Sequence, residues 1–479
     1  MIITTLTKSN AKGVTDVERA TVNRLIEKLG RHGTKNVWRK ELYDQKRVVQ
    51  SLGIEGREDL RLVRHTLGWC TKAVDSLSAL VINEGISIPG VRLADTGLDK
   101  YWEQNQLEIE SSQAEKSSVL HGIAYLVTTK GGPGEPDAIT TPKDSLSGTG
   151  EWNTRTRRLD NFLSVLGIDD NGITEMVLYL PGYSLYLLRV GTEWMEQRER
   201  SNLPFVPVER LPHNPRTGHE DGSSLITMAA IYHQEAGIRA LVRGEQGAQE
   251  FIDPVRALLN ADMSQFKNED GTFNEAYYAL RNSRTIALEP NVIDILNPDG
   301  TDGEAIAPQS FQMIPGLDMT PHITHFEQAA NNFAAEIGMA SNEYGVRGVA
   351  QPVSAEALNA GRNPLILRAE AAARGFKYAY SRSAKTAYMI MNNTNELPPE
   401  IDRLTVNYRD PNRASRAAMA DATAKEAAAG AYAPRSIVKL RRMGLTADEI
   451  EEVQAEWDMA EAAGYLDALN GVNVNGTGN

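Results

Sequence analysis

Few residues in the sequence have types and spacings that could do chemistry. His322 and His325 lie three residues apart on one predicted helix, so they could share a metal ion. No carboxylate or third histidine is placed beside them, and the polar start of a helix is the more common alternative. The basic run from Thr154 to Arg158 could contact phosphate, although a solvated turn between two strands is more common. The same two alternatives stay open for Arg239, Arg243, Arg441 and Arg442.

Catalytic motifs are missing from the sequence. It has no Gly-x-x-x-x-Gly-Lys-Ser/Thr loop, so the ATPase of any motor would be another protein. It has no His-Glu-x-x-His, and Gly148-Thr149-Gly150 lacks the third glycine of a dinucleotide loop. The single cysteine, Cys70, excludes zinc sites with several thiolates. We therefore predict no catalytic residues, no cofactor and no metal site.

The composition indicates a folded protein of several domains. With 479 residues, 41% of them hydrophobic and 24% charged, the chain can form roughly two to four domains. No apolar run reaches the roughly 18 residues of a membrane span, and the N-terminus lacks a basic region followed by an apolar segment. We expect neither membrane insertion nor secretion. Cys70 has no partner for an intramolecular disulfide and is expected to be buried, as suits a reducing cytoplasm.

The net charge of −13 limits how the protein can meet nucleic acid. Wrapping DNA through a general basic surface needs Lys and Arg to neutralise phosphates, which this balance disfavours. The charge does not exclude a protein past which DNA slides.

The first half of the chain predicts helices followed by strands. Helical spacing covers residues 15–29, 39–52 and 67–82. Residues 122–127 predict a strand entered from a helix, and residues 174–180 and 183–188 predict a hairpin joined by Pro181-Gly182. This half reads as an α+β domain that ends near residue 222.

Two long helices flanking an insertion are predicted next. The first runs from Ser224 to Ala248, capped by Ser223 or Ser224, and the second opens at Thr320. Between them, short pieces and turns predict a compact insertion. The second helix carries a narrow apolar stripe that suits either core packing or an oligomer interface. Its members are Ile323, Phe326, Ala330, Phe333 and Ile337.

The stretch from Ser341 to Lys385 is the most informative part of the sequence. A glycine-bearing loop leads to Ser354, whose hydroxyl can cap the next helix, and Pro364 is expected to kink that helix. Beyond it we predict a strand at residues 404–408 and helices at residues 435–443 and 446–462. The predicted elements end in a disordered tail, residues 471–479.

This order resembles the portal proteins of tailed double-stranded DNA bacteriophages, and in particular the siphovirus-like group. The resemblance is carried by the amphipathic helix, the loop, Ser354-Ala355-Glu356-Ala357-Leu358, and a long Pro-bearing helix with Arg368, Arg374 and Lys377. Trp102 and Asn105 before a helix, followed by Gly122-Ile123-Ala124-Tyr125, look like the same family's pattern. The resemblance covers nearly the whole chain and depends on the ordered set, not on one motif.

The resemblance implies a mainly helical α+β architecture of wing, stem, clip and crown that assembles into a dodecameric ring. The implied parts are the wing (1–223 and 354–411), the stem helices (224–250 and 318–340), the clip (251–317), the tunnel loop (341–353) and the crown with its disordered tail (412–479).

The resemblance also implies roles for individual residues. The tunnel loop would line a DNA channel through Asn342, Glu343, Tyr344, Gly345, Arg347, Gly348 and Gln351. Pro364 would supply the helix kink, and the stem would pack through Ile323, Phe326, Phe333 and Ile337. A mostly acidic channel would keep DNA from sticking, while a positive ring from Arg347 would brake sliding.

The implied function is a channel at one capsid vertex for genome packaging, DNA retention and ejection. The protein would be assembled in the host bacterial cytoplasm and reside in the virion. The implied partners are double-stranded DNA, the terminase large subunit, a head-completion adaptor, and the major capsid and scaffolding proteins, with no membrane partner.

Two other classes of protein remain as alternatives. Another ring-forming head-tail connector would share the acidic balance, but the long insertion between two stem helices argues against it. A hydrolase that uses Asp and Glu pairs would need a clustered acid, base and nucleophile, which the sequence does not indicate. Ring formation and an activity screen distinguish the three.

Overall fold

The computed structural model combines helices and strands in two compact units, Met1–Tyr408 and Arg409–Asn479. This agrees with the predicted α+β class. The residues that the structure describes are 5–46, 66–252, 256–259, 263–275, 277–278, 291–307, 310–313, 319–344, 355–412, 416–445 and 447–473.

A single long helix, α1 (Asp16–Tyr43), opens the first unit. Thr15 and Glu18 form a reciprocal capping box at its start. The sequence predicts two separate helices here, residues 15–29 and 39–52. Their separation is wrong, because the chain stays helical through Gly30 and Gly33. Packing overrides the low helix propensity of glycine: Leu25 lies in one core and Leu42 in another. Residues 47–65 lie outside the described part of the chain.

A five-stranded antiparallel sheet packs on α1. Its order follows the sequence: β4 (Gly148–Asn153), β5 (Arg158–Asp169), β6 (Gly172–Leu180), β7 (Tyr183–Val190) and β8 (Glu193–Arg200). Val22 and Leu25 of α1 share a core with Leu178 and Leu187 on one face of the sheet. The predicted hairpin at Pro181-Gly182 is confirmed, and Gly182 takes a φ of +84° in its turn.

A second sheet covers part of the other face. It has the order β3 (Ala138–Asp144), β2 (Ile123–Lys130) and β9 (Val208–Pro212). The Tyr125 and Phe162 rings, whose centroids are 4.7 Å apart, join the two sheets. The opposite face of β2, with Ala124 and Leu126, enters the main core. Burial on both faces explains the unbroken apolar run that predicted this strand.

The main core gathers helices from distant parts of the chain. These are α3 (Trp69–Ser78), α4 (Leu98–Gln104), α5 (Leu107–His121) and the long helix α9 (Ala355–Met391). The short helices η1 (Leu93–Thr96) and α10 (Pro399–Asp402) connect neighbouring elements. The predicted strand near residue 405 is β14 (Thr405–Tyr408), which pairs antiparallel with β1 (Asn83–Ser87). Cys70 is fully buried, as predicted.

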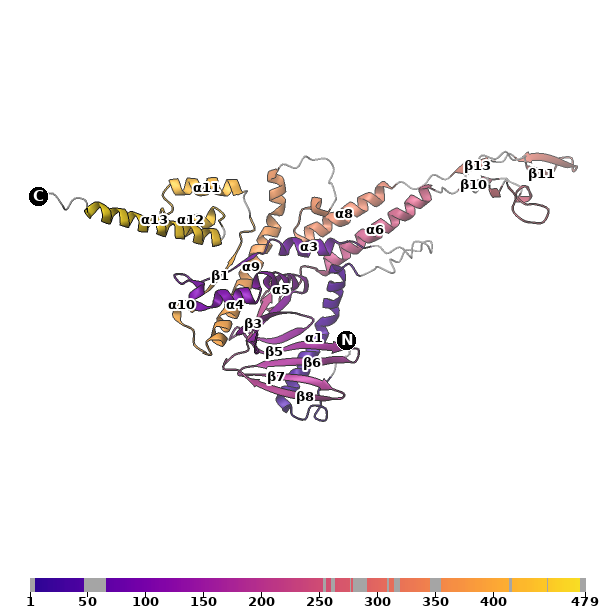
Figure 1. Cartoon of the computed structure of the whole chain (residues 1–479). Helices are drawn as coiled ribbons and strands as arrows, with labels where there is room; N and C mark the ends of the chain where they lie inside the picture. Colours follow the sequence, from indigo (N-terminus) through magenta and orange to yellow (C-terminus); the bar gives the residue numbers. More distant parts are fainter. Residues whose placement is uncertain are drawn as a thin grey trace. The chain divides into compact units, whose positions relative to one another are not determined.

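Two helices, α6 (Met228–Ile252) and α8 (Thr320–Ile337), lie side by side (Figure 1). The predicted cap of the first is wrong. Thr227 caps it by accepting a hydrogen bond from the Ala230 N–H at 3.1 Å, whereas the Ser224 hydroxyl donates to the Leu120 carbonyl. The helical spacing of the apolar residues predicted α8 correctly, and Pro321 lies in its first turn.

The insertion between α6 and α8 contains two antiparallel ribbons, which continue beyond the helix ends in Figure 1. β10 (Arg256–Leu259) pairs with β13 (Ser310–Met313), and β11 (Asn291–Leu296) pairs with β12 (Asp302–Ala307). The short helix η2 (Met263–Phe266) precedes one of the predicted turns. Gly271 and Gly300 each adopt a φ of +83° in turns of this insertion, where the sequence predicted turns between short pieces.

The second unit is helical. Its elements are α11 (Arg416–Ala428), α12 (Ile437–Arg442) and α13 (Ala447–Asn473). The tail was predicted to begin at Gly471, but α13 continues to Asn473. Thr446, the first residue of the predicted helix 446–462, and residues 474–479 lie outside the described residues.

Glu18 makes a buried ionic contact whose loss can be measured. It is 4% exposed and accepts hydrogen bonds from Arg198 at 2.8 Å and Tyr183 at 3.1 Å. Burial alone raises the pKa of Glu18, but these bonds and those from Thr15 outweigh it and lower the pKa to about 2 from 4.5. This stabilises the folded state above pH 4.5, and the contribution is lost as the pH falls toward 2.

We expect Glu18→Gln to lower the free energy of unfolding at pH 7 by about 3 kcal/mol, the equivalent of that pKa shift. In urea titrations the difference from the natural protein should shrink by more than half at pH 3. The control is Glu27→Gln on the same helix, whose side chain is 70% exposed and should matter little at either pH. An equal loss at pH 7 and pH 3 would contradict the ionic explanation.

Candidate functional site

The candidate site is the junction where α8 ends, the short helix η3 (Ser341–Tyr344) follows and α9 begins. Gly338 ends α8 with a φ of +78°, and its N–H donates to the Ala334 carbonyl at 2.8 Å. Arg368 of α9 donates to the Glu336 carbonyl at 3.2 Å, which satisfies another terminal carbonyl of α8. The two helices are therefore joined at the start of the candidate loop.

Tyr344 anchors η3 in an aromatic cluster. Its ring centroid lies 5.1 Å from that of Phe333 and 6.1 Å from that of Trp69. Trp69 in turn lies 5.5 Å from both Phe326 and Phe333. The Tyr344 hydroxyl contacts the Met339 sulfur at 2.9 Å, and burial raises the pKa of Tyr344. This packing fixes the first end of the segment that runs to α9.

The position of Tyr344 corrects the sequence analysis, which placed this side chain on the DNA channel. Tyr344 is 7% exposed and belongs to the main core. We therefore remove it from the residues proposed to face DNA. The sequence carried no signal for this, because the partners Trp69 and Phe333 come from other helices.

Charged side chains surround the same junction. Glu343 is half-buried and forms an ion pair with Arg362 of α9 at 3.1 Å. Lys72 donates to the Glu343 carbonyl, and its ammonium lies 5.7 Å from the centre of the Tyr344 ring. Arg362 pairs with the Glu343 carboxylate, whereas Lys72 and Arg368 donate to the backbone carbonyls of Glu343 and Glu336.

The other predicted loop residues divide into two groups. Asn342 belongs to η3, so its backbone is helical. Gly345, Arg347, Gly348, Gln351 and the predicted cap Ser354 lie outside the described residues. Pro364 lies inside α9, exposed to solvent, and the helix continues on both sides of it. The expected kink at Pro364 stays a prediction.

The apolar stripe predicted for α8 contains both buried and exposed residues. Phe333 and Ile337 are fully buried, and Phe326 packs against the main core. Ile323 is 56% exposed, so core packing is excluded for this residue and an oligomer interface remains its predicted alternative. The helix extends beyond the core at its N-terminal end, and Ile323 lies on that extension.

Gly237 of α6 has a structural role that its sequence context did not indicate. A Cβ at this position would lie 2.6 Å from Trp69 Cη2, so only glycine permits the close approach of α6 to α3. Gly237 is therefore a packing contact between the two helices. The Gln234 side chain, one turn earlier, accepts a hydrogen bond from the Cys70 N–H at 2.9 Å.

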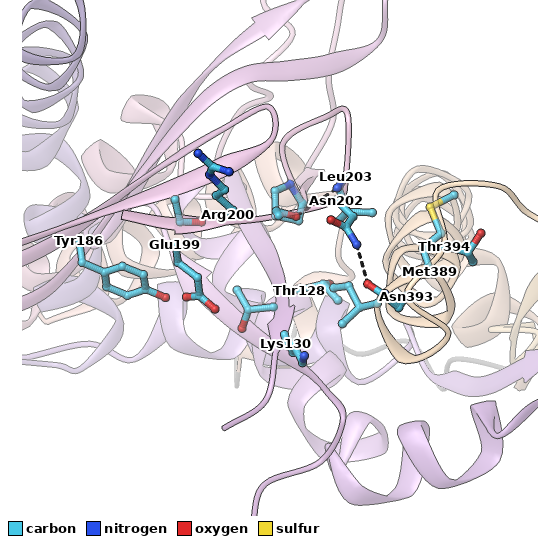
Figure 2. Close-up of a pocket in the computed structure, with 15 residues that line it drawn as sticks. Thr128, Lys130, Tyr186, Glu199, Arg200, Asn202, Leu203, Met389, Asn393 and Thr394 are labelled. Carbon is cyan, nitrogen blue, oxygen red and sulfur yellow. Dashed lines mark hydrogen bonds between the residues drawn. The ribbon is translucent and has the colours of Figure 1, made fainter. Parts of the chain in front are cut away.

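A cavity of about 280 Å³ lies at the opposite end of α9. Figure 2 shows Tyr186 and Glu199 on one side of it and Met389, Asn393 and Thr394 on the other. Asn202 donates to the Asn393 side-chain oxygen at 2.5 Å, which links the end of α9 to the segment after β8 (Figure 2). These contacts fasten α9, and we assign the cavity no chemistry.

The part of the chain that the structure describes contains no group of three His, Cys, Asp or Glu residues arranged to hold a metal. His322 and His325 lie in the first turns of α8. This position fits the alternative to a metal site, namely that the two histidines belong to the polar start of a helix. Within the same described residues, none of the helices has the length and apolar character that crossing a membrane requires.

The sequence matches the family described as phage portal protein, SPP1 Gp6-like, over residues 26–462. The portal proteins of Mycobacterium phage L5 and Mycobacterium phage D29 are each 26% identical to this chain. Each alignment covers 89% of this chain, with 85% of the L5 protein and 86% of the D29 protein. A chain of the neck of an empty GTA particle computed with C6 symmetry is 14% identical, with a TM-score of 0.46. That match covers 79% of this chain and 90% of the neck chain.

The aromatic anchor of η3 predicts a specific loss of stability. Tyr344→Ala should lower the free energy of unfolding by about 3 kcal/mol, because it leaves a cavity beside Trp69 and Phe333. Hydrogen exchange of residues 341–344 should become faster. Tyr344→Phe keeps the ring and should remain close to the natural protein.

The control for this prediction is Tyr378→Ala, since Tyr378 of α9 is 73% exposed. It should change stability by less than about 0.5 kcal/mol. Equal effects of the two alanine variants would show that Tyr344 does not anchor η3.

Proposed function

Because the chain belongs to the SPP1 Gp6-like family of phage portal proteins, we propose that it forms a dodecameric ring whose central channel passes double-stranded DNA. The family match over residues 26–462 is the observation that carries this proposal. In this role the protein acts in genome packaging, in DNA retention and in ejection at one capsid vertex.

Exposed apolar side chains on the paired helices support ring assembly. Met228 and Tyr232 of α6 are 63% and 61% exposed, and Ile323 of α8 is 56% exposed. On α9, Leu367 is 62% exposed. Contacts with neighbouring copies would bury such side chains and gain free energy from the apolar area removed from water.

We propose that residues 341–353 form the tunnel loop of this channel. The anchored residues Glu343 and Tyr344 hold its first end against α3 and α8, while Arg362 ties α9 to the same place. The residues proposed to face DNA are Asn342, Glu343, Gly345, Arg347, Gly348 and Gln351. The remaining acidic surface reduces adhesion of DNA, because like charges repel.

The proposed parts of the portal follow the elements of the structure. Residues 1–223 and 354–411 form the wing, α6 and α8 form the stem (224–250 and 318–340), and 251–317 form the clip. The crown (412–479) corresponds to the second compact unit, which begins at Arg409. Pro364 provides the proposed kink in α9 within the wing.

We propose that the clip docks the terminase large subunit during filling and a head-completion adaptor afterwards. Val292 and Leu296 of β11 are 53% and 74% exposed, so this ribbon offers apolar surface for contacts. The major capsid and scaffolding proteins are the proposed neighbours of the ring in the assembling head. Assembly takes place in the host bacterial cytoplasm, and the mature site is the virion.

The proposal assigns no catalysis to this chain. The full sequence lacks a phosphate-binding Gly-x-x-x-x-Gly-Lys-Ser/Thr loop, so ATP hydrolysis for packaging belongs to the terminase. A ring-forming connector of another kind is the second candidate, and the paired helices with their ribbon insertion favour the portal.

Ring assembly can be tested by native mass spectrometry and negative-stain imaging. The purified protein should form a ring of about twelve chains with a central channel. Ile323→Ser should shift the population toward smaller assemblies, because the exposed isoleucine is lost from the proposed interface.

Ile109→Ser is the matched control for this substitution, since Ile109 of α5 is 59% exposed and lies outside the paired helices. Circular dichroism should show both variants folded. Single chains or dimers of the natural protein, even with scaffolding protein present, would rule out the ring.

The tunnel loop can be tested in a packaging assay. Arg347→Ala should increase slippage of packaged DNA several-fold, because a ring of positive charges that brakes sliding is removed. Arg155→Ala changes the same residue type in the exposed turn between β4 and β5 and should leave slippage unchanged. Normal retention in Arg347→Ala would remove Arg347 from the proposed mechanism.

A further inference from the structure

A cavity of about 380 Å³ lies between α1, the end of α5 and the turn before α6. It is separate from the junction of α8, η3 and α9. Six basic side chains line it: Lys28, His32, Lys35, Arg39, His121 and His219. Its volume falls in the range of about 300–1,000 Å³ that is usual for small-molecule sites.

Arg39 is the central feature of this cavity, because its charge is only partly compensated. It is half-buried, and its guanidinium donates to the Asn36 side-chain oxygen at 3.2 Å and to the His121 carbonyl at 3.3 Å. Burial lowers the pKa of Arg39. Both acceptors are neutral, and no ion pair to Arg39 occurs among the residues that the structure describes. A guanidinium in this setting has donors left for an anion.

His121 supplies a second polar group without a partner. It is 7% exposed, and its Nδ1 is buried without a hydrogen bond within the described structure. Burial is the main cause that lowers the pKa of His121 to about 4. The negative charge of Asp144 raises the pKa, and the positive charges of Arg39 and Lys40 lower it further. The ring is therefore neutral at pH 7 and can donate one hydrogen bond.

Two carboxylates line the cavity, and Asp221 is paired with cations. Asp221 lies 3.1 Å from the Lys28 ammonium and 3.7 Å from the Arg210 guanidinium. Glu220 accepts a hydrogen bond from the Gly218 N–H at 3.1 Å. The Gly218 N–H is neutral, so Glu220 keeps its charge, but Lys28, Lys35 and Arg39 outnumber the two carboxylates among the residues that line the cavity.

We propose that this cavity is a binding site for a phosphate group. The planar Arg39 fork would bind two phosphate oxygens, Lys35 would add a point charge, and His121 would donate to a third oxygen. The bound anion would compensate the half-buried guanidinium. The phosphate can belong to a free phosphate compound or to the DNA backbone, since both present the same oxyanion.

The test measures thermal unfolding and isothermal titration of the full chain with inorganic phosphate, against sodium chloride of equal ionic strength. Phosphate should raise the melting temperature more than chloride does. Arg39→Gln should weaken phosphate binding about tenfold or more, because a charged hydrogen-bond donor is lost. Lys35→Gln, an exposed position, should weaken it several-fold without affecting folding.

Arg31→Gln is the matched control, because Arg31 lies on the same helix, is 65% exposed and does not line the cavity. It should bind phosphate like the natural protein. If short duplex DNA displaces phosphate, the DNA backbone is the source of the bound phosphate group. If it does not, the site binds a free phosphate compound. The proposal would be overturned if phosphate raised the melting temperature no more than chloride does. It would also be overturned if both single variants, Lys35→Gln and Arg39→Gln, bound phosphate like the natural protein.

Discussion

The indole of Trp69 joins the paired helices to the rest of the first unit. It contacts Phe326 and Phe333 of α8 and Tyr344 of η3, and it fits against Gly237 of α6 at a distance that excludes a Cβ. The same corner supplies the hydrogen bond from the Cys70 N–H to Gln234, which caps α3 from another helix. Because the start of the candidate loop is held here, its placement depends on this packing.

The long helix α9 is held to the body by polar contacts as well as apolar ones. Glu209 of β9 is 6% exposed and lies 3.3 Å from Arg158 and 3.6 Å from Arg382 of α9. Burial raises the pKa of Glu209 to about 7 even though both arginines oppose this. Thr128 and Ser383, 2.8 Å apart, form a second contact between β2 and α9. A buried polar pair works only in one register, so these contacts fix the position of α9 along the sheet.

Charge is distributed unevenly in this protein, and the distribution matters more than the total. The chain is acidic overall, which suits a surface past which DNA must move. Cations nevertheless gather at the base of the candidate loop, through Lys72, Arg362 and Arg368. Arg39 and Lys35 of α1 line a second basic site, a cavity that His121 of α5 and His219 also line. Both sites draw residues from distant parts of the sequence.

The sequence alone determined the helices α6, α8 and α9, the hairpin at Pro181-Gly182, the stripe of α8 and the order that resembles portals. These depend on local periodicity and turn chemistry, which neighbouring residues set. It could not separate buried Tyr344 from an exposed loop residue, or exposed Ile323 from its packed neighbours. It also divided α1 at Gly30 and Gly33 and missed the pairing of β1 with β14. Only the tertiary structure decided these points, because burial, long-range pairing and helix continuity depend on partners far away in the chain.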